Sequence, residues 1–333
     1  VRIRRIIKYS RKSTFHRQIT WILSTIQIIF LVNTKYRKYH LFITSNPPTT
    51  AFITAFCRNK YSIQILDIYP DALVLGGFIS QDSLVNRVWE RRNKKYFAGA
   101  KHVFTLTHGM AKTLSKYCET EKIKIIAQWP STTEYSHIEK NENKFILANS
   151  LQDYFIVMYS GNIGLGHRVD ALIEAARILK DNKEILFIVM GEGWNKPVIE
   201  KKIQDYGLSN CRVMSYQSPE MFNHSLQAAD IGVVSVTKEG ASLCVPIKTY
   251  NLINNQVPLL CIAEGPSELA RLATDYDIGK CFAPEQAYEI SEYIVMLKNE
   301  KETFSRYKKN LEKCSKHFTP DNALLYLENY FAT

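Results

Sequence analysis

The stretch 159-YSGNIGLGHRVD-170 places three glycines, Gly161, Gly164 and Gly166, between an apolar run and a run of helical character. Glycine lets an anion approach the backbone closely, and the first turn of a helix presents free N–H groups at the positive end of its dipole. The spacing therefore predicts a phosphate-binding turn between a strand and a helix. A tight strand–helix turn without a ligand is the alternative.

The order of these glycines separates the loop from a dinucleotide-binding turn. That fingerprint is GxGxxG, with an acidic residue about 20 positions later. Here the order is GxxGxG, and the next candidate acid, Glu192, lies 26 residues after Gly166. A nicotinamide cofactor is therefore not expected.

Strand and helix patterns alternate on both sides of a polar segment, residues 131–144, which is read as an interdomain linker. Strands are expected at 41–45, 62–69, 102–107, 123–128, 154–160, 184–191, 211–216, 230–236 and 258–263. Helices are expected at 49–58, 82–100, 108–117, 168–181, 197–207, 219–229, 247–255 and 266–274, with a last helical region from about 285, broken near Pro320.

This alternation predicts an α/β protein with two doubly wound parallel sheets, each covered on both faces. The domains are expected at residues 1–145 and 146–317, with a final helix at about 318–333 packing back on the first domain. Ligands of such sheets bind at the carboxyl ends of the strands, which predicts a site in a cleft between the domains.

Positive charge is concentrated in the first half of the chain. Residues 1–66 contain twelve Lys and Arg and no acidic residue, and the net charge is +15 for residues 1–150 and −4 for residues 151–333. A basic first domain predicts an anionic partner. Because no RNA- or DNA-binding motif is present, an anionic membrane surface is favoured over nucleic acid; a solvated basic face is the alternative.

The apolar run 19-ITWILSTIQIIFLV-32 is shorter than the roughly 20 residues of a membrane span. It predicts a half-buried helix with one face toward lipid headgroups, and no signal-peptide cleavage site follows it. The seven cysteines are scattered and contain no CxxC pair, which favours a reducing cytosol over a disulfide framework or a zinc site.

Taken together, several segments are similar to retaining glycosyltransferases of the two-Rossmann-domain (GT-B) architecture, in the family-four branch that builds capsule, O-antigen and exopolysaccharide. The donor-domain segments are YSGNIGLGHRVDALIEAARIL from residue 159, 189-VMGEG-193, 213-VMSYQSPEMFNHSLQAADIGVVSV-236 and 246-PIKTYNLINNQVPLL-260. Two more, 44-TSNPP-48 and 67-DIYPDALVLGG-77, resemble the acceptor domain. The resemblance extends from about residue 40 to 280.

The resemblance implies a metal-independent hexosyltransferase that takes its sugar from a nucleoside-diphosphate sugar, without cofactor. The implied acceptor is a glycan, in particular one linked to polyprenyl diphosphate, at the cytoplasmic face of the plasma membrane. A sugar-nucleotide epimerase on the same fold and an inactive sugar-nucleotide-binding protein are the alternatives. The acidic pair in 275-DYD-277 is read as a turn and not as a metal site.

Relatives place fixed positive charge against the donor diphosphate, where charge builds as the glycosidic bond breaks. Many carry Arg or Lys in the glycine-rich loop, where this chain has Asn162 and His167. The charge is therefore expected from Arg168 or from Lys248, and Lys248 is the preferred candidate. In the first domain, Asp67 is expected to end a strand and to orient the acceptor hydroxyl or accept its proton.

Other donor contacts are implied by position. Tyr216 is expected to stack on the base, and Asn251 stands seven residues before Pro258, where many relatives have a glutamate on the ribose hydroxyls; an amide can serve there by donating and accepting. The first glutamate of that pair has no counterpart in strict register, but Glu239 is near. The expected donor-binding residues are Gly161, Asn162, Gly164, His167, Arg168, Gly191, Gly193, Tyr216, Gln217, Glu239 and Asn251.

Relatives begin with a β-α-β unit that carries an acceptor loop, and such a unit takes 30 or more residues. Residues 1–40 offer one strand and one helix at most. The first domain is therefore expected to be truncated, because either the sequence is a fragment or the protein is degenerate. In the second case the first sheet is expected to have an uncovered edge and acceptor binding to be lost.

Overall fold

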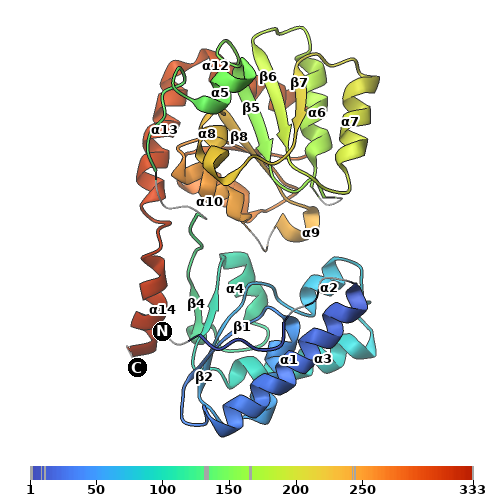
Figure 1. Cartoon of the computed structure of the whole chain (residues 1–333), viewed down its shortest axis with the longest axis vertical. Helices are drawn as coiled ribbons and strands as arrows, with labels where there is room; N and C mark the ends of the chain where they lie inside the picture. The colour runs from blue at the N-terminus through green and yellow to red at the C-terminus, as the bar shows by residue number, and fades with distance from the viewer. Residues whose placement is uncertain are drawn as a thin grey trace. The chain divides into compact units, whose positions relative to one another are not determined.

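The computed structural model describes residues 3–8, 10, 13–130, 135–164, 167–241, 243 and 245–331. The chain forms two compact units, one made of Val1–Ala127 with Ala323–Thr333 and the other of Gln128–Asn322 (Figure 1). The division falls earlier than the expected 145/146 because the polar segment is attached to the second unit. Ile138 N–H donates to Gln227 Oε1 at 3.0 Å, and Asn143 Nδ2 donates to the His224 carbonyl at 2.9 Å.

The second unit contains a six-stranded sheet in which every pair is parallel. Its strand order is β10-β9-β8-β5-β6-β7. This is the doubly wound order, in which the direction of strand addition across the sheet reverses between β5 and β8. The strands are β5 (Phe155–Ser160), β6 (Ile185–Met190), β7 (Cys211–Met214), β8 (Ile231–Ser235), β9 (Leu259–Ile262) and β10 (Gly279–Phe282).

Helices cover both faces of this sheet, and Figure 1 shows α6 and α7 on one side with α8 and α10 on the other. The helices of the unit are α5 (Lys144–Asn149), α6 (Val169–Ile178), α7 (Lys196–Asp205), η3 (Pro219–Met221), α8 (Phe222–Gln227), α9 (Lys238–Ala241), α10 (Ile247–Asn254), α11 (Glu268–Asp275), α12 (Ala287–Asn299) and α13 (Lys301–Ser315).

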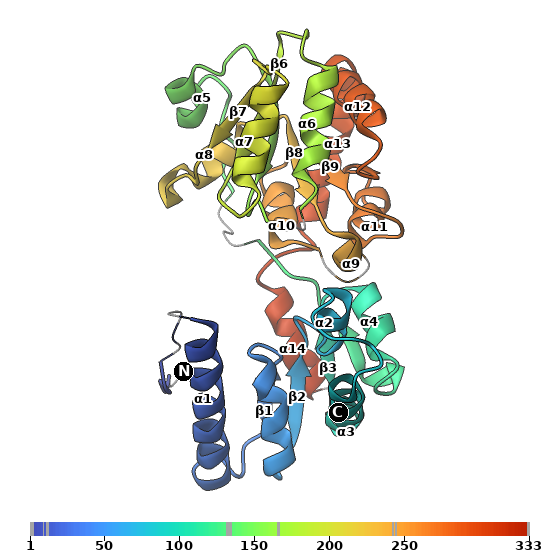
Figure 2. The same ribbon diagram turned by 90° about the vertical axis from the view of Figure 1, so that its right-hand side faces the viewer.

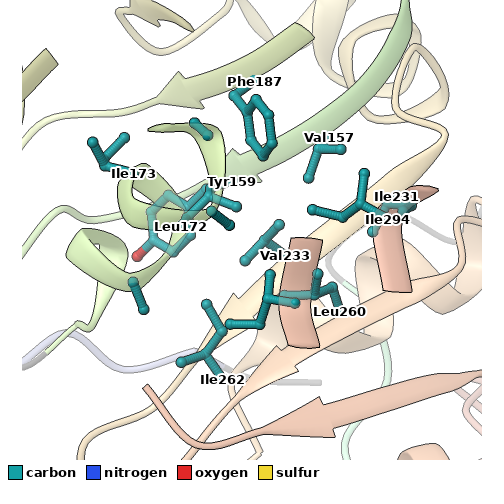
Figure 3. Close-up of a cluster of buried hydrophobic side chains, with 14 of the residues drawn as sticks. Val157, Tyr159, Leu172, Ile173, Phe187, Ile231, Val233, Leu260, Ile262 and Ile294 are labelled. Atoms are coloured by element: carbon teal, nitrogen blue, oxygen red, sulfur yellow. The ribbon is translucent and has the colours of Figure 1, made fainter. Parts of the chain in front are cut away.

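The core of the second unit lies between the sheet and the helices α6 and α12. Figure 3 shows Leu172 of α6 and Ile294 of α12 against strand side chains such as Val157 and Phe187, all of them almost completely buried. Because both sheet faces are covered, β6 is buried at every position, as a near-continuous apolar run predicts. Tyr159, near the end of β5, belongs to the same cluster.

The first unit contains a four-stranded parallel sheet of order β1-β2-β3-β4. Its strands are β1 (Leu41–Thr44), β2 (Tyr61–Gln64), β3 (Val103–Thr105) and β4 (Ile123–Ile125). Its helices are α1 (Thr14–Thr34), η1 (Pro48–Phe56), α2 (Asp71–Leu75), α3 (Leu84–Ala98), α4 (His108–Leu114), η2 (Thr120–Lys122) and α14 (Asn322–Phe331). β1 is an edge strand of the sheet described here.

The last helix, α14, lies beside the strands of the first unit (Figure 2). The ring of Tyr326 lies 4.8 Å from that of Phe104 and 5.6 Å from that of Phe42, measured between centroids. Gln64 Nε2 donates to the Tyr326 hydroxyl at 2.8 Å. An amphipathic helix at the end of the chain therefore covers part of a sheet formed nearly 200 residues earlier.

The helix α1 is longer and more exposed than expected. The helix has 21 residues because polar residues extend the apolar run at its ends. It begins after Ser13, whose side chain caps it by accepting a hydrogen bond from the His16 N–H. By length and composition, its segment Phe15–Thr34 is long and apolar enough to cross a membrane. Only 17% of the apolar 18-residue stretch within it is buried. The expectation that this helix is too short to span and half buried is therefore wrong.

Every strand expected from the sequence is present, and each is one to four residues shorter than expected. The strand β10 was missed because Gly279–Phe282 is short and only partly apolar. The short helices α2, α5 and α9 were also missed, since none exceeds six residues and periodicity needs a longer window.

Candidate functional site

The glycine-rich loop after β5 is held against the segment after β6 by backbone hydrogen bonds. Gly161 N–H donates to the Met190 carbonyl at 2.9 Å, and Ile163 N–H donates to the Glu192 carbonyl at 2.8 Å. Asn195 N–H donates back to the Ile163 carbonyl at 2.9 Å. These contacts fix the path of the loop, and they occupy the N–H groups of Gly161 and Ile163.

Two glycines after β6 are required by this close approach. Gly191 has φ +148°, and a side-chain carbon there would overlap the carbonyl oxygen of Gly161. Gly193 has φ +155°, and its added carbon would overlap the Ile163 carbonyl and lie 2.8 Å from Asn162 Oδ1. The segment 191-GEG-193 therefore serves chiefly to let the two loops touch, a role that the sequence alone did not reveal.

The loop also reaches the end of β8, across the point where the strand order reverses. His167 Nδ1 lies 3.3 Å from the Ser235 carbonyl, and Arg168 N–H donates to Ser235 Oγ at 3.0 Å. The reversal point at the carboxyl ends of a parallel sheet is where doubly wound folds bind ligands. The candidate site of the second unit is therefore built at the expected end of the sheet.

Lys248 places its ammonium group beside this loop. It lies in the first turn of α10, which begins after Pro246. Its Nζ is 3.7 Å from the ring centroid of Tyr159, and a carbon added to Gly161 would lie 3.2 Å from Nζ. The Nζ atom is buried and has no hydrogen-bond partner among the described residues. Removing an amine from water without giving it a partner costs free energy. An anionic ligand that paired with Nζ would offset this cost.

Burial lowers the pKa of Lys248 to about 7, because the charged form loses its hydration there. The pKa of His167 is also lowered, first by burial and then by its proximity to Lys248. The positive charge beside the loop is therefore expected on Lys248, because the lowered pKa of His167 favours its neutral form.

Arg168 does not belong to this region. Its guanidinium pairs with Asp170 at 3.2 Å, Glu264 at 3.4 Å and Glu285 at 3.5 Å, and the Asp170 hydrogen bond leads the causes that raise its pKa. A cation surrounded by three carboxylates has little net charge to offer. Of the two candidate charge donors, the geometry therefore favours Lys248.

The remaining donor-site candidates fall in three groups. Tyr216 lies two residues after β7, exposed, and its ring is 3.5 Å from a carbon added to Gly191, so it stands at the rim of the site. Gln217 donates to the Ser215 carbonyl at 3.1 Å. Asn251 is buried one turn after Lys248 on α10. The side chain of Glu239 lies outside the described part of the structure.

In the first unit, Asp67 lies three residues beyond the end of β2 and does not end the strand as expected. Its N–H donates to Ser45 Oγ at 3.2 Å, and burial raises the pKa of its carboxyl. Asp71, four residues later, is engaged by Lys116 and by the Tyr117 hydroxyl at 2.6 Å. Asp67 is thus the carboxylate of this segment that has no ion pair with a described residue.

Sequence reasoning missed two residues that position the site. Tyr159 provides the aromatic face under Lys248, and its hydroxyl donates to the Asn162 carbonyl at 2.7 Å. Ser235 ends β8 and holds the start of α6. The sequence signal that could have identified them is their position near the carboxyl ends of β5 and β8, the two central strands. Among the described residues, no group of three or more His, Cys, Asp and Glu side chains could hold a metal ion, and Asp277 of the 275–277 turn is paired with Arg306 at 2.9 Å.

Residues 139–313 match the family described as Glycosyl transferases group 1. The chain is 21% identical over 221 residues to WbjE of Pseudomonas aeruginosa, provisionally named a glycosyltransferase, covering 66% of this chain and 55% of WbjE. It is 28% identical over 189 residues to WcaI of Escherichia coli (strain K12), provisionally named a colanic acid biosynthesis glycosyl transferase, covering 55% and 46%. The chain thus spans about half the length of these relatives.

The fold is similar to that of the Anabaena protein Alr3699/HepE, whose crystal structure is a complex with UDP and glucose. The TM-score is 0.74 at 13% sequence identity, over 93% of this chain and 81% of the other. At this identity the likeness speaks for the fold alone. It confirms the expected class, two parallel-sheet α/β domains of the GT-B kind.

Proposed function

The chain belongs to the Glycosyl transferases group 1 family, and on that premise we propose that it transfers a sugar from a nucleoside-diphosphate sugar to a glycan acceptor in cell-surface polysaccharide biosynthesis. The observation that carries the proposal is Lys248, whose buried amine has no hydrogen-bond partner among the described residues and lies against the glycine-rich loop at the reversal point of the donor sheet. The named relatives support the branch of metabolism, and a solved neighbour that holds UDP supports the donor class.

In this proposal the donor diphosphate contacts Lys248 and the loop Gly161–Gly164. Lys248 is desolvated in advance, so its charge is not screened by water and costs no reorganisation during the reaction. Tyr159 supports the ammonium by a cation–π contact. Tyr216 stacks on the base at the rim, and Asn251 takes the ribose hydroxyls.

The proposed step breaks the bond between the donor sugar and its diphosphate oxygen, and the electron pair leaves with the nucleoside diphosphate. The acceptor hydroxyl forms the new bond on the face that the diphosphate leaves, so the configuration is retained, and its proton passes to the leaving phosphate. Lys248 stabilises the charge that builds on that phosphate. Asp67, whose pKa is raised by burial, orients the acceptor hydroxyl.

The proposed acceptor is a glycan carried on polyprenyl diphosphate, and the proposed location is the cytoplasmic face of the plasma membrane. Two features of the first unit support a membrane surface as partner. Residues 1–66 carry twelve basic and no acidic residues, and α1 exposes apolar side chains beside them. Basic charge attracts anionic lipid, and exposed apolar side chains enter the headgroup layer.

A thermal-shift panel of UDP, GDP, ADP, dTDP and NAD tests the donor site. At a ligand concentration 100 times Kd, one-site binding adds about 2.7 kcal/mol of stability, which is a clear shift. We expect one nucleoside diphosphate to stabilise the chain and NAD to have no effect. A panel without any shift would contradict the donor site. A shift without transfer to any acceptor would favour an inactive binder, and release of free nucleotide with an epimerised sugar would favour an epimerase.

A further inference from the structure

A cavity of about 270 Å³ lies in the first unit, between η1, the start of β2 and the helix α3. It is separate from the donor site, which lies wholly in the second unit. Four aromatic residues line it: Phe52 from η1, Tyr61 from β2, and Trp89 and Tyr96 from α3. Phe52 is exposed, and Trp89 stacks on Tyr69 with centroids 6.1 Å apart. The cavity therefore presents a largely apolar, aromatic interior.

Two cations line this cavity. Arg92 and Lys95 belong to α3 and are exposed. Neither forms an ion pair with a residue that the structure describes. They lie one helical turn apart, as i and i+3, and Arg92 follows Trp89 at the same spacing. Their positive charge is therefore not neutralised by a described carboxylate.

Tyr96 is the most buried of the four aromatic residues that line the cavity, at 6% exposed. Aromatic walls and two cations without an ion pair among the described residues together fit an amphipathic anion.

We propose that this cavity binds the isoprenyl-diphosphate end of a lipid-linked acceptor. The diphosphate would lie at Arg92 and Lys95, and the first isoprene units would pack on Phe52, Tyr61 and Trp89. A volume of about 270 Å³ is at the lower end for small-molecule pockets, so the cavity holds part of the lipid and leaves the glycan outside. The inference rests on the proposed function, because that function supplies the acceptor class.

Farnesyl diphosphate is a soluble probe for this cavity, and titration calorimetry on the full chain measures its binding. Inorganic diphosphate and farnesol are the comparison ligands, since each carries half of the chemistry. We expect farnesyl diphosphate to bind at least tenfold more tightly than either. Equal binding of inorganic diphosphate would reduce the site to a patch of charge, and equal binding of farnesol would reduce it to an apolar surface; either result would overturn the proposal.

The helix offers a matched pair of double variants. Arg92→Ala/Lys95→Ala removes the two cations that line the cavity and should weaken farnesyl diphosphate binding about tenfold. Arg91→Ala/Lys94→Ala removes the same charge at the same spacing from α3, outside the cavity, and should leave binding within about twofold. Equal loss in both variants, or none in the first, would sink the proposal.

Failure here is distinguishable from failure of the proposed function. Nucleotide stabilisation reports on the second unit and should be unchanged in Arg92→Ala/Lys95→Ala. If nucleotide binding and sugar transfer are present while farnesyl diphosphate does not bind, the cavity proposal alone is wrong. If farnesyl diphosphate binds in the cavity while no nucleotide stabilises the chain, the donor function is wrong and the lipid site stands.

Discussion

The positive charge of the candidate donor site lies on one nitrogen atom, Nζ of Lys248. Within the described part of the chain its buried amine has no hydrogen-bond partner, and it lies on the face of Tyr159 beside Gly161. A protein interior tolerates such a group only at a cost in stability, and functional sites are where such costs are found. The neighbouring cation, Arg168, is already neutralised by carboxylates, so the two are not interchangeable.

Replacing Lys248 by alanine should lower kcat for sugar transfer about 100-fold, the usual cost of losing one preorganised charge stabiliser. The variant should fold, since it removes a desolvated charge. Lys183→Ala, an exposed lysine in the turn before β6, is the matched control and should behave as the parent. An unchanged kcat in Lys248→Ala would remove this residue from the proposed mechanism.

Nucleotide affinity should fall as the pH rises above 7. The pKa of Lys248 is lowered to about 7, so below pH 7 the amine is already protonated in the free protein and affinity is constant. Above it, binding a diphosphate must take up a proton, which weakens affinity by up to about tenfold per pH unit. Calorimetry from pH 6 to 9 measures this.

The same titration of Lys248→Met controls for protons on the ligand, on His167 and on Tyr159, the titratable groups that face the amine. Its affinity should be weaker and should lack the fall above pH 7. Identical pH profiles for parent and variant would show that Lys248 does not titrate in this range.

At the scale of elements, the site depends on two loops that touch through their backbones. The turns after β5 and β6 continue the register of their strands, with Gly161 N–H bonded to Met190 and Gly191 N–H bonded to Met214. Only glycine permits this approach, because any side chain at Gly191 would overlap the opposite backbone. The position of the loop relative to Lys248 is therefore set in part by Gly191, which follows a different strand.

Gly191→Ala should displace the glycine-rich loop and abolish the nucleotide thermal shift. A clash with fixed backbone adds about 1–3 kcal/mol to the strain of a positive φ. Gly207→Ala is the matched control, since Gly207 has φ +60° with nothing within 4 Å of an added carbon; it should cost only the strain, about 1–2 kcal/mol, and keep the shift. Equal loss of the shift in both variants would show that general destabilisation is responsible.

At the scale of the whole molecule, charge and exposed apolar surface are unevenly shared. The first unit holds the basic segment and the exposed face of α1, where Ile26 is 58% and Phe30 is 65% exposed. The second unit holds the donor site and is mildly acidic by sequence, at −4 for residues 151–333. This asymmetry suits a division in which one unit meets the membrane and the other holds the soluble donor.

Flotation with vesicles that contain anionic lipid should recover the chain, and raising the salt concentration should weaken binding, because ions screen the basic segment. Ile26→Ser/Phe30→Ser should weaken binding on the order of tenfold by removing apolar area. Tyr288→Ser, an exposed aromatic residue of the second unit, should have no effect. Binding that is independent of salt and of the α1 variant would contradict a membrane role for the first unit.

The sequence by itself determined the fold class, the order of strands and helices and the place of the glycine-rich loop. These follow from periodicity, from glycine spacing and from the rule that parallel strands end at one edge, all of which are local properties. It also brought Lys248 into consideration beside Arg168 and preferred it, but a choice on physical grounds, by which of the two cations is free of carboxylates, lay outside the sequence.

That choice was made by tertiary structure. Whether a cation is free depends on which carboxylates lie near it, and those of Arg168 include Glu264 and Glu285, about 100 residues away in the chain. Whether an amine is desolvated depends on what packs around it, and for Lys248 that is Tyr159, from a strand formed 89 residues earlier. Pairing and burial are relations between distant segments, and only the folded chain defines them.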